Sequence, residues 1–298
     1  MIRHQCEYEA IKELSEEKHY PVHKLCKYLH IARSAYYRWL KCPKSRHQIE
    51  NEEIAREIRE IHDEHPDMGY RRIRDELAIY HDIKVNDKRV LNINRKLQIH
   101  SCIKYKSKSC TRGSSNPYHI ANNDLNREFH AEAPNQKWLT DVSEFKYRTG
   151  TEVRKVYLSA ILDLYDRRIV AFKISDHNDN PLVMNTFDEA IQLEPDAHPL
   201  FHSDRGFQYT SREFYTRLQQ SHMKQSMSRV AHCIDNGPME GFWGILKREM
   251  YYGHRFTDHD VLVKAISDYI IYYNNRRLQR RLKIMTPMEF HNNYLQAA

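Results

Sequence analysis

The sequence predicts an all-helical amino-terminal region followed by a mixed α/β domain, and three observations lead to this fold class. In residues 20–97, apolar side chains recur at the three- and four-residue spacing of amphipathic helices. After Pro134 the pattern changes to buried strands that alternate with helices. Only 8 of the 298 residues are glycine, which favours helices over glycine-rich turns and phosphate-binding loops. At this length about two domains are expected.

The first helical unit lies in residues 20–42. Val22, Leu25 and Leu29 have helical spacing, and Ser34 is a candidate cap for a second helix that carries Trp39. Two short helices joined by a tight turn form a helix-turn-helix candidate, whose second helix would present basic side chains to a DNA groove. The same pattern also fits an ordinary small helical bundle, so this alternative stays open.

A second helical unit is expected in residues 50–97, with helices at 50–65, 71–80 and 86–97. Gly69 interrupts the pattern after the first of them, and the last leads into a basic segment. This arrangement again resembles a helix-turn-helix fold. The residues that follow at 113–133 contain Gly, Ser, Asn and Pro with few apolar side chains, and they are expected to form a linker.

The elements expected after Pro134 are three antiparallel strands, followed by alternating helices and strands. The strands are expected at 137–147, 153–166, 167–175, 199–203 and 223–227, and the helices at 181–193, 237–251 and 258–273. This order of elements describes a mixed sheet with helices packed on it.

The distribution of charge points to a polyanionic partner. The chain has 47 Lys and Arg against 40 Asp and Glu, and most of the surplus lies in residues 1–130, with 25 basic and 19 acidic side chains. Residues 88–123 contain no acidic side chain at all. Such a block usually binds a polyanion, although a solvated face or a linker is the alternative reading.

Several protein classes are excluded by composition. No apolar stretch approaches the length of a membrane span, and the first residues lack the apolar core of a signal peptide. The six cysteines are scattered without a CxxC pair, which is typical of reduced thiols in a cytosolic protein. A cytoplasmic protein without a membrane partner is therefore expected.

Three carboxylates are candidates for metal ligands. Asp141 lies within the first predicted strand, Asp204 directly follows a later strand, and Glu240 lies in the first turn of a helix. An enzyme that cuts phosphodiesters with two metal ions needs hard oxygen ligands that converge from separate elements. With 40 acidic residues in the chain, each one alone is more often a solvated charge, and Glu240 could simply interact with its helix dipole.

Four stretches of the sequence resemble the DDE transposases of insertion-sequence family three, which are bacterial enzymes related to retroviral integrase. These stretches are NREFHAEAPNQKWLTDVSEF, FHSDRGFQYTS, DNGPMEGFWGILKREM and YYNNRRLQRRLKIMTPMEF. Between Asp204 and Glu240 lie 35 residues, and Lys247 follows seven positions after Glu240. The amino-terminal stretches LCKYLHIARSAYYRWL and HPDMGYRRIRDEL also look like the second-reading-frame product of this family, so the resemblance covers nearly the whole chain.

The resemblance implies an RNase H-like catalytic domain, the integrase catalytic core, that cuts and joins DNA. Asp141, Asp204 and Glu240 match the DDE positions and would hold two Mg²⁺ ions, with Mn²⁺ as a substitute. The implied reaction frees a 3′ hydroxyl at each end of the element, and this hydroxyl then attacks a phosphodiester of the target. Lys247 would share the helix face of Glu240 and would touch the terminal nucleotides; an exposed helix lysine is the alternative.

The sequence departs from the family pattern at one place and from the retroviral proteins at another. Ala231 and His232 stand where the family usually has Gly-Asn, so altered contacts with the DNA end, or loss of activity, are alternative outcomes. His19 and His23 have no CxxC partner, and no structural zinc site is expected. His202, near Asp204, is expected to pack or to form hydrogen bonds.

Further DNA contacts are expected from basic side chains outside the carboxylate site, because such clusters bind phosphates. Base reading is assigned to the amino-terminal arginines, although a solvated helix face is the alternative for each of them. The complete set of predicted DNA-binding residues is Arg33, Arg38, Arg71, Arg72, Arg74, Lys104, Lys106, Lys108, Lys247, Arg276, Arg277, Arg280 and Arg281.

These expectations combine into one domain scheme and one function. A helix-turn-helix-like segment is expected at 1–48, a second helical DNA-binding domain at 49–112, a linker at 113–133 and the catalytic domain at 134–298. The expected function is DNA transposition by at least a dimer bound to element ends and target DNA, in association with the bacterial nucleoid. The first-reading-frame product of the same element is a further expected partner. A non-catalytic DNA-binding regulator and a nuclease that only hydrolyses DNA are the rival functions.

Overall fold

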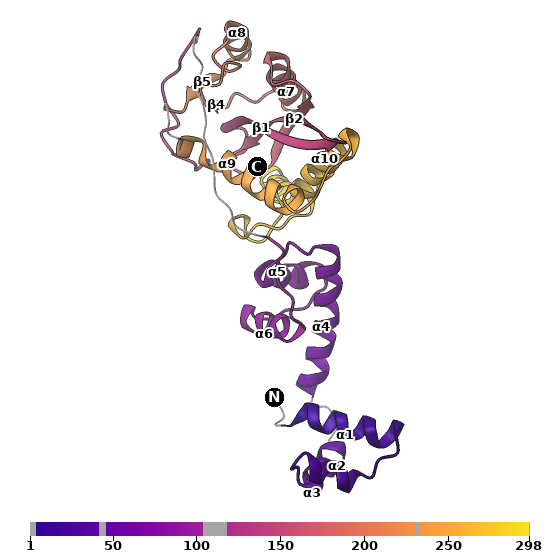
Figure 1. Cartoon of the computed structure of the whole chain (residues 1–298). Helices are drawn as coiled ribbons and strands as arrows, with labels where there is room; N and C mark the ends of the chain where they lie inside the picture. Colours follow the sequence, from indigo (N-terminus) through magenta and orange to yellow (C-terminus); the bar gives the residue numbers. More distant parts are fainter. Residues whose placement is uncertain (1–3, 42–45, 104–117, 230–232, 298) are drawn as a thin grey trace.

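The computed structural model describes residues 4–41, 46–103, 118–229 and 233–297, and in these ranges the chain forms three successive parts (Figure 1). Two helical units lie at the amino-terminal end, and a sheet with helices on both faces forms the rest. The architecture expected from the sequence, helical units followed by a mixed α/β domain, is therefore confirmed. Of the described helices, none is long and apolar enough to cross a membrane.

The first unit contains α1 (Gln5–Glu17), α2 (Val22–Tyr28) and α3 (Arg33–Lys41). Its small core is formed by one buried cluster of side chains, Tyr8, Ile11, Cys26, Ile31 and Tyr36. Trp39 stacks on Tyr8 with a ring-centroid distance of 5.4 Å, so α1 closes the helix pair that the sequence predicts. Cys6, Cys26 and Cys102 are free thiols, as expected.

The second unit contains α4 (Arg46–Glu64), α5 (Tyr70–Tyr80) and α6 (Asp87–Leu97). Ile54, Ile58 and Ile61 share one face of α4 and pack against the apolar faces of α5 and α6. The side chain of Asn86 accepts a hydrogen bond from the Arg89 backbone N–H and so caps α6, because the first N–H groups of a helix lack partners within it.

The sheet contains β1 (Lys137–Thr149), β2 (Glu152–Asp163), β3 (Ile169–Ser175), β4 (Leu200–Ser203) and β5 (Lys224–Met227). Their spatial order is β3-β2-β1-β4-β5. The pairs β3-β2 and β2-β1 are antiparallel, whereas β1-β4 and β4-β5 are parallel. Gly150, in the turn between β1 and β2, has a φ of 62°, a left-handed conformation that glycine adopts at little cost.

Two buried clusters cover the two faces of this sheet. One contains Trp138 and packs against α7 (Asn180–Leu193) and α8 (Arg212–Gln220). The other contains Leu139, Phe145 and Tyr147 and packs against α9 (Gly237–Leu246) and α10 (His259–Asn275), as Figure 1 shows. Side chains alternate between the faces of a strand, so the odd-numbered residues of β1 face α9 and α10.

The structure corrects several expected elements. It adds α1, α8 and the carboxy-terminal helix α11 (Pro287–Ala297), which the sequence analysis did not predict. The helix expected at 237–251 is α-helical only to Leu246 and continues as a π turn, Lys247–Tyr251. α10 ends at Asn275 and not at residue 273.

Residues 118–133, the described part of the expected linker, lie against the catalytic domain. Leu125 is buried in its core, and the Leu125 N–H donates to Ser226 Oγ at 3.0 Å. The backbone N–H groups of Tyr118 and His119 donate to the Thr210 carbonyl. This part of the chain is therefore packed onto the sheet domain, while the domain boundaries themselves stay a prediction.

Candidate active site

Asp141 and Asp204 lie on neighbouring strands at the same edge of the sheet. The parallel register pairs Leu139 of β1 with His202 of β4. Two residues further along each of these strands, Asp141 therefore lies beside Asp204. β4 ends at Ser203, and Asp204 is the first residue after it. Ligands commonly bind at this carboxyl edge of parallel strands.

The helix α9 brings Glu240 to the same region. Trp243 Nε1 donates to Asp141 Oδ2 at 3.0 Å, and Glu240 lies three residues earlier on the same helix face. The charge of Glu240 acts on Asp141 and raises its pKa. Asn236 Nδ2 donates to the Thr140 carbonyl at 3.1 Å, which fixes the start of α9 to β1. The structure therefore places Asp141 beside Asp204 and Glu240 on the helix that contacts Asp141.

The electrostatics of this site disfavour ionised carboxylates. Burial, the charge of Asp204 and the charge of Glu240 together raise the pKa of Asp141 from 3.8 to about 7. Burial also raises the pKa of Asp204, although its Oδ1 accepts a hydrogen bond from the Gly206 N–H at 2.8 Å. Strongly perturbed carboxyl groups of this kind are typical of functional sites and of sites that bind cations.

His202 keeps its ring buried beneath Asp204. Its two ring nitrogens lie 2.9 Å from Ser226 Oγ and 3.0 Å from Ser228 Oγ. Burial lowers the pKa of His202 to about 4, so the ring is neutral at physiological pH. The expected hydrogen-bonding role is confirmed.

Lys247 is the first residue of the π turn, and its side chain extends toward β1. Its Nζ is 5.0 Å from the centroid of the Phe145 ring, which is a cation–π distance. Burial lowers the pKa of Lys247, and the negative charges of Asp141 and Glu144 oppose this effect. The side chain is half-buried near Asp141, and the alternative of an exposed helix lysine is wrong.

A clamp of ion pairs holds the chain just before α9. Asp235 is fully buried, and it accepts hydrogen bonds from Arg127, Arg229 and Asn123. The Arg229 guanidinium is the main reason that the pKa of Asp235 lies well below its ordinary value. Along the sequence, Ala231 and His232 stand between Arg229 and Asp235, and they are outside the described residues. Sequence reasoning missed Asp235, although it directly precedes the asparagine of the DNG motif.

The oxygen chemistry of the three carboxylates fits a hard divalent ion. Asp141 and Asp204 are neighbouring buried acids with raised pKa values, and a divalent ion would offset the cost of their ionised forms. Within the described ranges, no group of three or more His, Cys, Asp or Glu side chains is close enough together to hold a metal ion. The carboxylates are therefore adjacent but do not form a closed metal site in this structure.

The predicted DNA-binding residues fall into groups with different surroundings. Arg33, Arg38 and Arg281 are exposed, and Arg71 is exposed over the Tyr70 ring. Lys104, Lys106 and Lys108 lie outside the described residues. The remaining arginines, Arg72, Arg74, Arg276, Arg277 and Arg280, are all bound to carboxylates of the same chain.

These bound arginines mainly join the second helical unit to the catalytic domain. Arg280 contacts Asp75 at 2.8 Å and Asp87 at 3.2 Å, and Arg276 contacts Glu76 at 3.1 Å. The guanidinium of Arg276 also lies 3.3 Å from the centroid of the Tyr80 ring. The cluster that the sequence assigns to phosphate contacts therefore has intramolecular partners, and DNA binding by these arginines stays a prediction.

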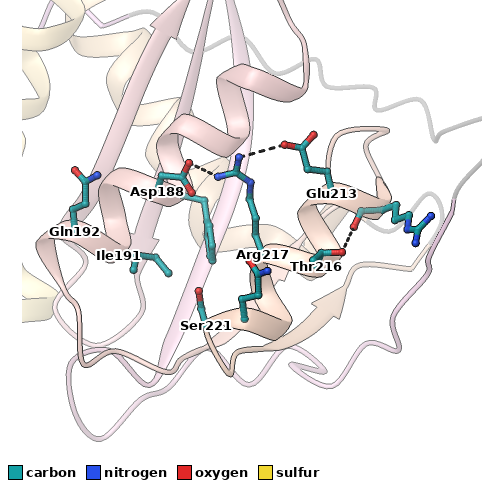
Figure 2. Close-up of a pocket in the computed structure, with 10 residues that line it drawn as sticks. Asp188, Ile191, Gln192, Glu213, Thr216, Arg217 and Ser221 are labelled. Carbon is teal, nitrogen blue, oxygen red and sulfur yellow. Dashed lines mark hydrogen bonds and ion pairs between the residues drawn. The ribbon is translucent and has the colours of Figure 1, made fainter.

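A separate groove of about 870 Å³ lies between α7 and α8, away from the three carboxylates. Figure 2 shows Arg217 in this groove between Asp188 and Glu213, with ion pairs to both. The floor is partly apolar, with Phe187 and Ile191 among the lining residues. This groove contributes no side chain to the candidate active site.

The strand order and the carboxylate edge define a protein with an integrase-type catalytic core. The family model "Integrase core domain" matches residues 131–233, a second model of that description matches residues 240–295, and an "HTH-like domain" model matches residues 48–107.

Known proteins with the same organisation identify the family. The chain is 36% identical over 286 residues to the protein InsK of insertion sequence element IS150 in Escherichia coli K12, covering 95% of this chain and 98% of that protein. It is 33% identical over 277 residues to the 31 kDa protein of insertion element IS600 in Shigella sonnei, covering 92% of this chain and 100% of that protein. It is 30% identical over 250 residues to the transposase for IS904 in Lactococcus lactis, covering 83% of this chain and 96% of that protein. The chain belongs to the DDE transposases of insertion-sequence family three.

Solved structures of retroviral integrases show a weaker likeness. The catalytic core of HTLV-2 integrase in complex with magnesium matches 54% of this chain and 99% of that chain, with 19% identity and a TM-score of 0.43. A chain of the simian T-cell lymphotropic virus intasome matches 78% of this chain and 74% of that chain, with 18% identity and a TM-score of 0.46. Likenesses at this level do not extend to function.

Proposed function

We propose that this transposase binds the ends of its insertion sequence, cuts one strand at each end and joins the freed 3′ hydroxyl to target DNA. The observation that carries this proposal is the adjacent pair Asp141 and Asp204, with Glu240 on the facing helix α9. Burial raises the pKa of both aspartates, and the neighbouring negative charges raise the pKa of Asp141 further. Such a site favours the binding of divalent cations, and these cations would neutralise the charge of the reacting phosphate groups.

Asp141, Asp204 and Glu240 would hold two Mg²⁺ ions, or Mn²⁺ in their place. When bound, a divalent ion stabilises the negative charge that develops on the phosphate during displacement. Glu240 would complete this ligand set from α9. Trp243 and Asn236 attach α9 to β1 and so would hold the helix that carries Glu240 beside Asp141.

Lys247 would bind the terminal phosphates of the DNA end. Its ammonium group lies on the same side of β1 as Asp141 and keeps one face of Phe145 covered. An ammonium group in this position supplies charge without base specificity. Sequence recognition would then come from the helix-turn-helix-like units, with a dimer or higher oligomer pairing two ends. Such an enzyme would work in the bacterial cytoplasm on nucleoid DNA.

The test uses a labelled duplex that carries an element end, with Mg²⁺ or Mn²⁺, and the purified full chain. Glu240→Gln and Asp204→Asn should abolish strand cleavage and keep DNA binding, whereas Glu213→Gln, an exposed acid on α8, should change neither. Cleavage at the wild-type rate in the first two variants would refute the assignment. Cleavage without any joined product would identify a nuclease, and DNA binding without cleavage by the wild-type chain would identify a regulator.

A further inference from the structure

The π turn Lys247–Tyr251 continues α9, so one continuous segment carries Glu240, Lys247 and Glu249. π-helical turns are rare, and they often occur at functional sites. The first residue of this turn, Lys247, reaches over Phe145 toward the carboxylate site. The geometry of the turn therefore decides where the Lys247 ammonium group lies.

Glu249, the third residue of the turn, is held by side chains from three other parts of the chain. Its carboxylate accepts hydrogen bonds from Arg277 Nε at 2.9 Å and Nη2 at 2.7 Å, from Arg72 Nη1 at 2.9 Å and from the Tyr269 hydroxyl at 2.7 Å. Its side chain is only 6% exposed. A carboxylate accepts about four hydrogen bonds, so Glu249 is saturated. We call Arg72, Glu249 and Arg277 the Glu249 cluster.

Arg72 connects this cluster to the second helical unit. It lies on α5 and also donates to Asp67 Oδ2 at 2.7 Å and to the Tyr272 hydroxyl at 2.9 Å. Its guanidinium therefore contacts a loop of its own unit, the π turn and α10 at the same time. An arginine suits this role because its planar group presents several donors in fixed directions.

Stability alone does not account for the cluster. Ion pairs that are removed from water contribute little net stability, and their best-supported role is to select one geometry. The same two domains are already joined by Arg280 with Asp75 and by Arg276 with Glu76, and these pairs lie off the π turn. The distinct contribution of the Glu249 cluster is thus its grip on the turn that carries Lys247.

We propose that the Glu249 cluster is a positioning device that holds the π turn, and through it Lys247 beside the carboxylate site, only when the second helical unit is docked. Arg72 and Glu249 are positioning residues, because they act through Lys247. This role links the placement of a DNA-binding unit to the active site. Its kinetic consequence rests on the proposed function, whereas its structural consequence does not.

The structural consequence is tested by hydrogen exchange on the full chain. Arg72→Ala should speed amide exchange in residues 247–251 about tenfold, since each lost restraint of this kind changes an opening equilibrium by about that factor. Asp75→Asn is the matched control, because it weakens another ion pair of the same interface. Exchange in 247–251 that is unchanged by Arg72→Ala, or raised equally by Asp75→Asn, would overturn the proposal.

The kinetic consequence is tested by a double-mutant cycle on strand cleavage at saturating DNA. Arg72→Ala should lower the cleavage rate about tenfold with an unchanged Kd for the duplex, and it should have no further effect in the Lys247→Ala background. Multiplied rate losses in the double variant would indicate a general structural role and overturn the proposal. A weaker Kd with an unchanged rate would make Arg72 a DNA contact, and this would overturn it as well. A wild-type chain that cleaves no DNA would instead refute the proposed function, and hydrogen exchange would still decide whether Arg72 holds the turn.

Discussion

Replacing Asp141 by Asn should stabilise the metal-free protein at alkaline pH, even though this residue is proposed to be essential for activity. The pKa of Asp141 is raised from 3.8 to about 7 in the folded chain. A carboxyl group whose pKa is raised by folding contributes most to stability below its unfolded pKa, and this contribution is lost as the pH rises through its folded pKa. The free energy of unfolding of the wild-type protein should therefore decrease between about pH 4 and pH 7 as Asp141 ionises. The Asp141→Asn variant should not show this decrease.

The size of the effect follows from the surroundings of Asp141. A pKa change from 3.8 to about 7 corresponds to roughly 4 kcal/mol against the ionised form. Part of this is screened because the side chain is partly exposed. The carboxylate also accepts hydrogen bonds from the Val142 N–H and from Trp243 Nε1, and an amide would lose one of these at a cost of about 1 kcal/mol. The expected net gain at pH 8 is about 2 kcal/mol.

Urea unfolding from pH 4 to pH 8 in the presence of a chelator measures this difference. At pH 4 the variant should be no more stable than the wild type, and at pH 8 it should be more stable by the amount above. Added Mg²⁺ should stabilise the wild type more than the variant, because ligand binding stabilises the state that binds it. Glu213→Gln serves as the control, with no expected change in the pH dependence. A variant that is less stable than the wild type at pH 8 would show that ionised Asp141 does not destabilise the folded protein.

Two further predictions concern structural acids of the same domain. Asp235→Asn should cost about 3 kcal/mol at pH 7, because buried Asp235 pairs with Arg229 and Arg127. Since folding lowers the pKa of Asp235 well below its ordinary value, its contribution is complete above about pH 4 and decreases gradually as the pH falls toward the folded pKa, so urea unfolding should show the difference shrinking in acid. A difference between wild type and variant that does not shrink at all between about pH 5 and about pH 2 would contradict this. His291→Ala removes the 2.7 Å contact to buried Asp166 that holds α11; it should cost about 2 kcal/mol and speed proteolysis within residues 287–297, and unchanged cleavage there would contradict the anchoring role.

The elements found by sequence reasoning are those whose apolar side chains follow one clear period. α4 shows isoleucines at helical spacing, and β2 has an apolar run from Val156 to Leu162 that only Ser159 interrupts, so both were predictable. α8 was missed because only Phe214 and Leu218 of its residues are buried, too few to show a period. The π turn could not be predicted, since its geometry depends on Glu249 reaching partners that lie far away in the sequence.

The carboxylates were found because a family motif marks their positions, and the structure adds the physical reason for their placement. The β1-β4 register brings Asp141 beside Asp204, and no spacing within the sequence contains this pairing. The sequence did not single out Trp243, since a tryptophan on a helix is more often a core residue. Its indole N–H in fact donates to Asp141, so this side chain both packs in the core and orients the site.

Charge in the sequence and charge on the molecular surface differ most at the arginine-rich segment after α10. Arg276, Arg277 and Arg280 are basic in the sequence, but the carboxylates of Glu76, Glu249 and Asp75 neutralise them in the fold. A guanidinium with a bidentate carboxylate partner binds a phosphate only after that partner leaves, and separating such a pair costs free energy. These ion pairs also neutralise the negative charges of Asp75 and Glu76 in the second helical unit.

The same pairing leaves a different basic surface free. The side chains of Lys88, Arg95 and Lys96 on α6 are exposed and form no hydrogen bond or ion pair with the residues that the structure describes. Arg95 and Lys96 follow Lys88 by seven and eight positions, which is about two helical turns, so the three side chains share one face of the helix. Because docking neutralises Asp75, Glu76 and Asp87 of the same unit, its remaining field toward solvent is more positive than its composition suggests. Domain docking therefore neutralises three acids of the second helical unit, while basic side chains of α6 stay exposed to solvent.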